Sequence, residues 1–157
     1  MPDREPKFTR LISSLFMHDR TARTLSTLHT LLYRITRGRL GRRLVDNDML
    51  LLTTTGRISG KTHTVPLLYL EDGGALVVIA SWGGRPDHPH WYENLVTQPR
   101  CYVTLPGRRF PATARTASPD ERHQWWPKVV AAYDGYATYQ SRTNREIPIV
   151  YLEPVQA

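Results

Sequence analysis

Two pairs of short strand-like runs, each pair joined by a tight turn, constrain the fold of this chain more than any other feature. The runs and their turns are residues 62–71 and 75–82 around Asp72-Gly73-Gly74, and residues 101–105 and 108–116 around Pro106-Gly107. Turns of this composition let the backbone reverse direction within a few residues, so each pair predicts a β-hairpin. Hairpins run antiparallel, and the sequence therefore predicts an antiparallel sheet.

Helical patterns lie between and after the predicted strands. Residues 90–97 read as a short helix between Pro89 and Pro99. Ser118-Pro119-Asp120-Glu121 predicts a helix start, with Ser118 as N-cap and a reciprocal glutamate three residues later. The tyrosine-rich residues 133–141 form a second helical piece, and further strands are expected at residues 49–55 and 147–153. The resulting fold class is mainly β with α (α+β): an antiparallel, barrel-like sheet with covering helices.

The composition is that of a globular chain large enough for one core. It has 157 residues, 40% hydrophobic and 22% charged, which fits a single domain. The one cysteine, Cys101, excludes an internal disulfide framework and a cysteine-based zinc site. Because it lies in the strand-like run CYVTL, we expect a buried and inert thiol.

The positive charge belongs to the first part of the chain. Residues 1–45 hold ten Arg or Lys against three Asp or Glu, which accounts for the whole net charge of +7. Leucines at helical spacing line one face of this arm, with arginines beside them; they are Leu25, Leu28, Leu32, Arg20, Arg23, Arg34 and Arg37. We expect a basic amphipathic arm at residues 1–45 and a cofactor-binding barrel at 46–157. The arm is suited to an anionic membrane surface, to packing its leucines on the barrel, or to both.

The sequence shows no membrane-spanning segment, signal peptide or nucleic-acid-binding pattern. No apolar run reaches the length needed to cross a bilayer, and the first ten residues lack the apolar core of a signal peptide. We therefore expect a cytoplasmic protein, peripheral on the inner face of the membrane if the arm binds there. The neutral body and the absence of a basic-aromatic face argue against nucleic-acid binding. A monomer and a homodimer both remain open.

Two glycine-bearing turns are the candidate binding sites. The first, TTTGRISGK (residues 53–61), resembles a phosphate-binding P-loop, but only three residues separate Gly56 from Gly60 and a strand pattern follows. A P-loop needs four residues there and must open a helix, so we exclude an NTPase. The second turn contains Ser81-Trp82-Gly83-Gly84. Backbone N–H groups with Arg57 and Lys61 are suited to an anion, and the aromatic and hydroxyl groups of the second turn to a flat ring.

Other reactive side chains give a weaker signal. Tyr133, Tyr136 and Tyr139 are spaced by three and share a helix face, which suits either packing or proton donation to a substrate. His88 and His90 have no third partner at convincing spacing, so no metal site is expected. No Ser-His-Asp arrangement is supported.

These motifs together resemble the deazaflavin-dependent nitroreductase family, whose members use reduced coenzyme F420. The resemblance rests on TTTGR-x-SGK, the DGG hairpin, the run S-x-GG-x-x-x-HP-x-WY-x-NL-x-x-x-P that starts at Ser81, and the tyrosine helix before IPIV; it covers residues 50–154. It implies a split β-barrel related to FMN-binding oxidases. It also implies that the cofactor ring lies beside the second glycine turn, with its phosphate and glutamate tail over the first.

The resemblance assigns roles to individual residues. The implied contacts with the tail and phosphate are Arg57, Ser59, Lys61 and His63; those with the ring and linker are Pro66, Ala80, Ser81, Gly83 and Gly84; those on the bordering helix are Pro89, Trp91 and Asn94; and the substrate-side groups are Tyr133, Tyr136 and Tyr139, with Ser81 assisting. Three positions depart from the family pattern: Ile58 and His63 stand where basic residues are frequent, and Trp82 where smaller or polar residues are common.

The implied activity is transfer of a hydride from reduced coenzyme F420 to an electron-poor acceptor. The acceptor is a small molecule such as a quinone, an enone or an activated nitro compound, which makes the chain an oxidoreductase of the nitroreductase and quinone reductase type. Two other classes remain open at this point. One is a split barrel that uses FMN or handles haem; the other is a non-catalytic flavin- or lipid-binding protein, in which the tyrosine face is dispensable.

Overall fold

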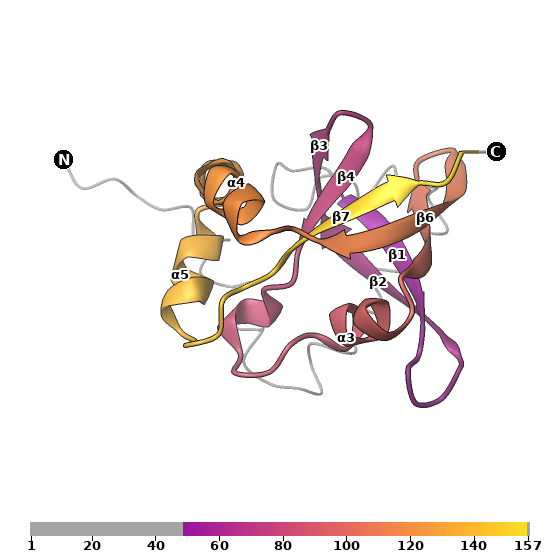
Figure 1. Cartoon of the computed structure of the whole chain (residues 1–157), viewed down its shortest axis with the longest axis horizontal. Helices are drawn as coiled ribbons and strands as arrows, with labels where there is room; N and C mark the ends of the chain where they lie inside the picture. Colours follow the sequence, from indigo (N-terminus) through magenta and orange to yellow (C-terminus); the bar gives the residue numbers. More distant parts are fainter. Residues whose placement is uncertain (1–48, 157) are drawn as a thin grey trace.

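The computed structural model describes residues 49–156, which form one antiparallel sheet with helices on both faces (Figure 1). The strands are β1 (Met49–Thr55), β2 (Thr62–Leu68), β3 (Leu70–Asp72), β4 (Ala75–Ile79), β5 (Arg100–Leu105), β6 (Arg108–Thr116) and β7 (Ile149–Pro154). The helices are the 3₁₀ turn η1 (Trp82–Gly84), α3 (His90–Thr97), α4 (Pro119–Ala132) and α5 (Gly135–Ser141). None of these helices is long and apolar enough to cross a membrane. The predicted arm at residues 1–45 lies outside the described residues.

The sheet has the strand order β2-β1-β5-β6-β7-β4-β3, and all its pairs are antiparallel. The predicted β5–β6 hairpin is confirmed, with Leu105 opposite Arg108 across the Pro106-Gly107 turn. Strands β2 and β4 contact each other although they are not neighbours in the ladder. The sheet is therefore curled into a half-barrel, and the predicted antiparallel, barrel-like α+β class is confirmed.

The prediction of one long strand at residues 62–71 is wrong. This run is interrupted at Tyr69, and its two parts lie at opposite edges of the sheet. Strand β2 pairs with β1 along its whole length, from Met49 opposite Leu68 to Thr55 opposite Thr62. Only β3 remains to pair with β4. The chain changes partner because β4 is short: in the register of β3, Leu68 would already face Ile79, the last residue of β4. Strand β1 instead offers β2 a full ladder of backbone hydrogen bonds.

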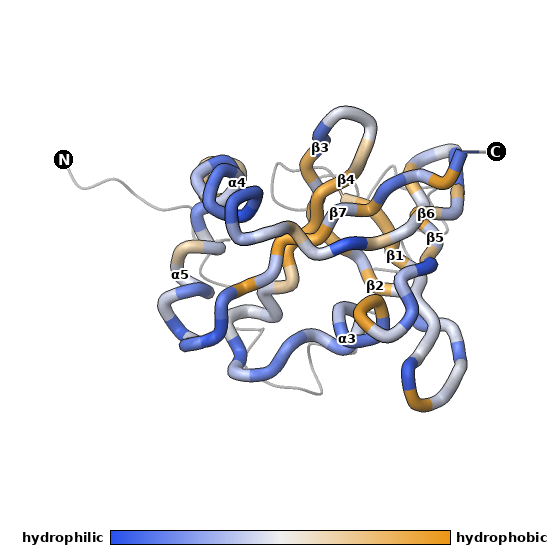
Figure 2. The backbone as a smooth tube through the Cα atoms, viewed as in Figure 1, coloured by the Kyte–Doolittle hydropathy of each residue, from blue (hydrophilic) through white to orange (hydrophobic). Residues whose placement is uncertain are grey.

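Alternate residues of the central strands enter two separate cores. Leu50, Leu52, Val78 and Leu152 point inward, where Trp91 and Leu95 of α3 cover them. Strand residues of the opposite parity pack under α4 and α5; this outer core comprises Val77, Ile79, Ile149, Tyr151, Trp125, Val129 and Tyr136. Figure 2 shows the apolar residues concentrated on the crossing strands β1, β4 and β7. The expectation of a buried Cys101 is confirmed, and burial raises its pKa to about 11.

The start of α4 follows its predicted sequence signal. The Ser118 hydroxyl accepts a hydrogen bond from the Glu121 backbone N–H (3.2 Å), and the Ser118 N–H donates to the Glu121 carboxylate (2.8 Å). Pro119 occupies the first helical position, where its missing N–H has no partner to lose. This capping box fixes the direction in which α4 leaves β6, and so sets the path of the chain toward the tyrosines of α5.

Candidate active site

The first glycine turn gathers three of the predicted anion-binding residues at one exposed loop. The turn closes through backbone bonds from Gly56 N to Lys61 O (2.7 Å) and from Gly60 N to Gly56 O (2.8 Å). The Ser59 hydroxyl accepts from the Lys61 backbone N–H (3.2 Å) and lies 3.3 Å from Nε2 of His63. The loop thus places Ser59, Lys61 and His63 together in solvent, as a site for a negatively charged group requires.

This turn is docked on helix α3. The Arg57 N–H donates to Oδ1 of Asn94 (3.0 Å), and the Asn94 amide donates to the Thr54 hydroxyl (3.1 Å). Asn94 is buried, with 4% of its surface exposed, so its role is to tie the turn to the helix. The Arg57 guanidinium forms an ion pair with Glu93 (2.8 Å). Arg57 is therefore already neutralised by a carboxylate, a contact that the sequence analysis missed.

The second glycine turn follows β4 and touches the beginning of the same helix. Trp82 has a φ of 44°, a left-handed conformation that costs a side-chain-bearing residue energy, and Gly83 and Gly84 also have positive φ. The ring centroids of Trp82 and His90 are 5.3 Å apart. The Arg85 guanidinium lies over the Trp82 ring, 4.9 Å from its centroid. Helix α3 therefore connects the two turns: Trp82 contacts its first residue and Arg57 its middle.

The second turn also lies directly against the tyrosine helix. A Cβ added to Gly84 would come within 2.3 Å of the Tyr139 carbonyl oxygen and 2.9 Å of the Arg142 Cβ. Only glycine permits this approach, which explains the residue at this position. The consequence is that η1, the turn that directly follows Ser81, packs against α5.

The three predicted substrate-side tyrosines form one aromatic cluster. The prediction that they share one helix is wrong, because Tyr133 caps the end of α4 in an extended conformation and only Tyr136 and Tyr139 lie on α5. Their ring centroids are separated by 5.3 Å (Tyr133–Tyr136), 6.3 Å (Tyr133–Tyr139) and 6.1 Å (Tyr136–Tyr139). Tyr136 is buried, while the hydroxyls of the half-buried Tyr133 and Tyr139 lie 3.4 Å apart. Burial raises the pKa of both Tyr136 and Tyr139. These phenols are therefore protonated near neutral pH and are available as hydrogen-bond donors.

An apolar pocket opens beside this cluster. Its lining comes from the β2–β3 junction, from β4 and from the end of α4 and the start of α5; the residues are Leu68, Tyr69, Leu70, Val77, Ile79, Ala132, Tyr133 and Tyr136. The pocket is too small to enclose a ring, so Tyr133 and Tyr136 border a gap between packed apolar side chains here.

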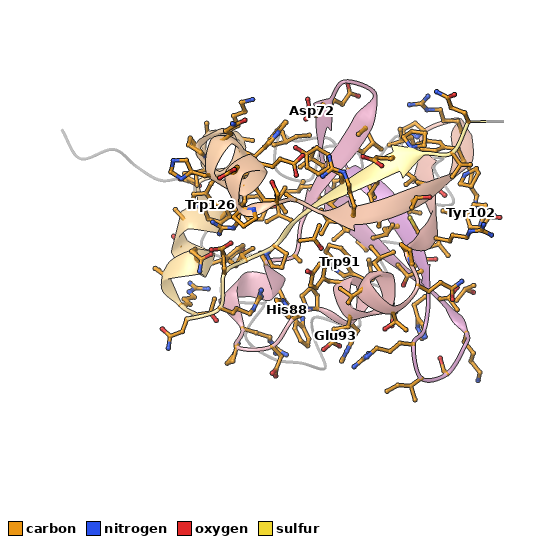
Figure 3. All side chains as sticks on the ribbon, viewed as in Figure 1. Asp72, His88, Trp91, Glu93, Tyr102 and Trp126 are labelled. Atoms are coloured by element: carbon orange, nitrogen blue, oxygen red, sulfur yellow. The ribbon has the colours of Figure 1, made fainter. Side chains whose placement is uncertain are left out.

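The remaining predicted contact residues are more dispersed. Ala80 is buried in the inner core, and its N–H donates to the Pro148 carbonyl (2.9 Å). Pro66 lies on β2 opposite Leu51 and is half-buried. Pro89 is the N-cap residue of α3. Trp91 lies on this helix, and its side chain is buried in the inner core (Figure 3). Pro89 and Trp91 therefore help to hold α3, the helix that connects the two turns, in place. Across residues 49–156, no three His, Cys, Asp or Glu side chains are grouped as metal ligands.

Sequence reasoning missed two charged residues that contact the predicted site. Glu93 pairs with Arg57, and the side chain of Arg145 reaches the backbone of Ala80 and Ser81. Glu93 stands inside the WYENL motif, so its position was visible but its partner was not. Arg145 is separated from Ser81 by 64 residues, and no periodicity or motif links the two.

The two turns are chemically suited to a phosphorylated, ring-bearing cofactor. At the first turn Lys61 is exposed to solvent, whereas the Arg57 guanidinium is paired with Glu93. The second presents backbone at Gly83, where an added Cβ would meet no atom within 4 Å, so a ligand can approach the main chain closely. Fold and turns together define a half-barrel with a candidate site for such a cofactor.

Comparison with known proteins identifies the family. Residues 25–154 match the family described as F420H(2)-dependent quinone reductase, and the chain belongs to this family. It is 39% identical to the F420H(2)-dependent quinone reductase Rv1261c of Mycobacterium tuberculosis (strain ATCC 25618 / H37Rv) over 82% of this chain and 89% of that protein. Membership confirms the predicted oxidoreductase class, coenzyme F420 as cofactor, and hydride transfer from its reduced form to a quinone.

Solved structures give the same relationship. An F420-H2 dependent reductase is 42% identical, with a TM-score of 0.61, over 67% of this chain and 93% of that one. A structure described as a domain-swapped dimer is 38% identical, with a TM-score of 0.63, over 80% of this chain and 96% of that one. These similarities confirm the split-barrel fold.

Proposed function

We propose that this chain reduces its acceptor between the Ser81 turn and the tyrosine cluster of α5. Coenzyme F420, when bound in its reduced form, supplies the hydride. Ser81 and the phenols of Tyr136 and Tyr139 donate hydrogen bonds to the acceptor oxygen as negative charge develops there, which favours the transition state over the bound substrate. The half-buried rings of Tyr133 and Tyr139 are proposed to border the quinone.

The observation that carries this proposal is the close approach of Gly84 to the Tyr139 carbonyl. It brings the turn that holds Ser81 against the helix that holds the tyrosines, although the two segments are more than fifty residues apart in the sequence. The proposal adds that the Ser81 hydroxyl and the phenols face one place, as an oxyanion-binding site needs.

Steady-state oxidation of reduced coenzyme F420 by a soluble naphthoquinone tests the proposal. We expect Ser81→Ala to lower kcat roughly tenfold, within the range for loss of one transition-state hydrogen bond. Ser141→Ala is the matched control, because the Ser141 hydroxyl is exposed and donates only to the Thr138 carbonyl of its own helix (2.7 Å). Equal rates for both variants would overturn the role of Ser81.

The cofactor tail is proposed to bind at the first turn, through Lys61, Arg57, Ser59 and His63. Support comes from the cationic side chains and the exposed backbone of this loop. The ring is proposed to lie near Pro66, Ala80, Gly83 and Gly84, with α3 as the wall between ring and tail. Fluorescence titration with oxidised F420 measures this binding directly. Saturable binding of FMN instead of F420 would contradict it.

Three broader properties extend this proposal. Enones and activated nitro compounds are further acceptors, because the same donors stabilise their reduced oxygens.

The protein works in the cytoplasm and contacts the inner face of the membrane through the basic arm at residues 1–45, where an apolar quinone would be concentrated.

The chain forms a homodimer. This proposal is supported by the related domain-swapped dimer and is tested by the mass of the purified protein in solution.

A further inference from the structure

The guanidinium of Arg145 makes four contacts with the segment that contains the second glycine turn. Its Nη2 donates to the Ser81 carbonyl (2.7 Å), its Nη1 to the Ala80 carbonyl (3.1 Å), and its Nε to the Arg85 carbonyl (2.9 Å). Nη1 also lies 3.2 Å from Nδ1 of His88. A single side chain from the approach to β7 thus holds both ends of a turn more than fifty residues away.

Arg145 is the hydrogen-bond donor in all four contacts. Arginine has only donors, so Nδ1 of His88 must accept, and the proton of the neutral imidazole is then on Nε2. Burial, followed by the charge of Arg145, lowers the pKa of His88 and keeps the ring neutral. Three carbonyls and one imidazole nitrogen therefore surround the cation with partial negative charge, and among residues 49–156 no carboxylate forms an ion pair with it.

The backbone conformation of the turn calls for a restraint from outside it. Within it, Gly84 N donates to Ser81 O (2.9 Å), and the longer Arg85 N to Trp82 O contact measures 3.3 Å. Three consecutive residues from Trp82 to Gly84 have positive φ, a conformation that for Trp82 persists only if its surroundings impose it. Arg145 contacts the carbonyls on both sides of this strained stretch.

Arg145 is itself positioned from the tyrosine helix. Gln140, the residue after Tyr139, donates through Nε2 to the Arg145 carbonyl (2.8 Å) and accepts from the Ile147 N–H at Oε1 (3.0 Å). The Arg122 guanidinium of α4 donates to the same Oε1 (2.9 Å). A continuous series of hydrogen bonds therefore runs from α4 and α5 through Gln140 and Arg145 to Ser81.

We propose that Arg145 is a positioning residue of the reductase site, which fixes the Ser81 turn relative to the tyrosines of α5. The inference rests on the proposed role of Ser81 as a hydrogen-bond donor. Arg145 acts through the backbone of the turn, with the three carbonyl contacts setting where the Ser81 hydroxyl lies. A lysine at this position keeps the charge but not the planar fork that reaches three carbonyls at once.

The first test needs no cofactor. Amide hydrogen exchange is followed over residues 80–86 in the wild-type chain, Arg145→Lys and the control Arg109→Lys. Arg109 is exposed and contacts the ring of Tyr102 (4.3 Å) on the far hairpin. We expect exchange in the turn to be roughly tenfold faster in Arg145→Lys only, because opening of the turn becomes easier when its restraint is lost. Unchanged exchange in Arg145→Lys would overturn the clamp.

The second test separates positioning from a general effect on folding. Turnover with a soluble naphthoquinone is measured for wild type, Arg145→Lys, Ser81→Ala and the double variant, at a temperature where circular dichroism shows each to be folded. We expect Arg145→Lys to lower kcat roughly tenfold in the wild-type background and less than about twofold when Ser81 is already alanine, since two residues that act through one group are not additive.

Each outcome is decisive. Equal fold losses in the two backgrounds would overturn the positioning role while leaving the proposed function intact. A Ser81→Ala variant as active as the wild type would overturn the proposed role of Ser81, and with it the route by which Arg145 acts. Faster exchange with fully retained turnover in Arg145→Lys would reduce Arg145 to a structural residue.

Discussion

At the scale of single residues, the sequence predicted which kinds of side chain lie at the candidate site better than it predicted which residues they contact. Glycine turns beside Arg57 and Lys61 indicated an anion site, and the structure places Ser59, Lys61 and His63 at one loop. The pairing of Arg57 with Glu93 could not be predicted, because it depends on how the β1–β2 turn docks on α3, 36 positions later in the chain. Long-range contacts of this kind are fixed only by the complete fold.

The Arg57–Glu93 pair leads to a prediction about cofactor affinity. Lys61→Ala should weaken F420 binding by about 1–3 kcal/mol, the usual cost of losing a charge-assisted bond. Arg57→Ala should cost less, because Arg57 must leave Glu93 before it can bind the tail. By the same reasoning, Glu93→Gln should strengthen binding. Dissociation constants from fluorescence titration at several salt concentrations measure these effects, which should shrink as salt rises.

Two results would contradict this account. If neither Lys61→Ala nor Arg57→Ala changes the dissociation constant, the first turn does not bind the tail. If Glu93→Gln weakens binding, Glu93 supports the site instead of competing with it. Lys128→Ala is a suitable control, because Lys128 contacts the ring of Trp125 (4.5 Å) on α4, away from both turns.

The tyrosine cluster gives a second prediction at this scale. Tyr136→Phe keeps the ring and removes the hydroxyl, so we expect a clear fall in kcat with a quinone, cofactor affinity within about twofold, and little change in melting temperature. Tyr139→Phe should act similarly but less severely, and Tyr133→Phe least. If the cluster only packs, all three Phe variants should turn over normally. Only the Ala variants should then melt earlier, and the buried Tyr136 should suffer most.

At the scale of elements, turn and cap signals predicted most boundaries. The β5–β6 hairpin, α3 and the start of α4 lie where Pro106-Gly107, Pro89 and Ser118 indicate. The interruption at Tyr69 was not predictable from local pattern. Residues 62–71 read as one strand-like run, and its division into β2 and β3 follows from which strands are available on each side. Local sequence thus specifies where strands form more reliably than which strands they pair with.

The capping box of α4 allows a prediction of stability. Ser118→Ala should lower the free energy of unfolding by about 1 kcal/mol, because the N–H of Glu121 loses its acceptor. Ser118→Asp should restore most of this loss, since aspartate also accepts from that N–H. Chemical denaturation followed by circular dichroism measures both. An unchanged stability in Ser118→Ala would mean that water replaces the cap without cost.

The same helix start should make stability depend on pH. Hydrogen bonds from Arg115 and from the Ser118 N–H lower the pKa of Glu121 to about 2, from an ordinary value of 4.5. Because the folded-state pKa is below that of the unfolded chain, the contribution is present above pH 4.5 and is lost as pH falls toward 2. The wild type should therefore lose more stability than Glu121→Gln over that range, as measured by melting temperatures at matched salt.

At the scale of the whole molecule, one curled sheet supports both the glycine turns and the tyrosine cluster. Its inner face is closed by α3, which connects the two glycine turns, and its outer face by α4 and α5, which bring the tyrosines to the end of β4 (Figure 1). The residue patterns predicted an antiparallel sheet with covering helices. Which helix covers which face was not predictable, because both cores draw on alternate residues of the same strands.

The division of charge along the chain gives the last prediction. The body at residues 46–157 is neutral, whereas the arm at residues 1–45 has a net charge of +7. If the arm contacts the membrane, the full-length protein should co-sediment with vesicles that contain phosphatidylglycerol and much less with pure phosphatidylcholine. Replacing Arg20, Arg23, Arg34 and Arg37 by Gln should weaken this binding at least tenfold. High salt should weaken it too, because each basic residue near an anionic surface contributes about 1 kcal/mol.

A variant with a similar loss of charge on the body separates this role from a general effect of net charge. Arg100, Arg108 and Arg109 are exposed on the paired strands β5 and β6. Their replacement by Gln should leave vesicle binding nearly unchanged. Equal losses in the two variants would show that binding follows total charge. Binding that ignores anionic lipid, or that survives removal of the four arm arginines, would leave the arm only the role of packing its leucines on the barrel.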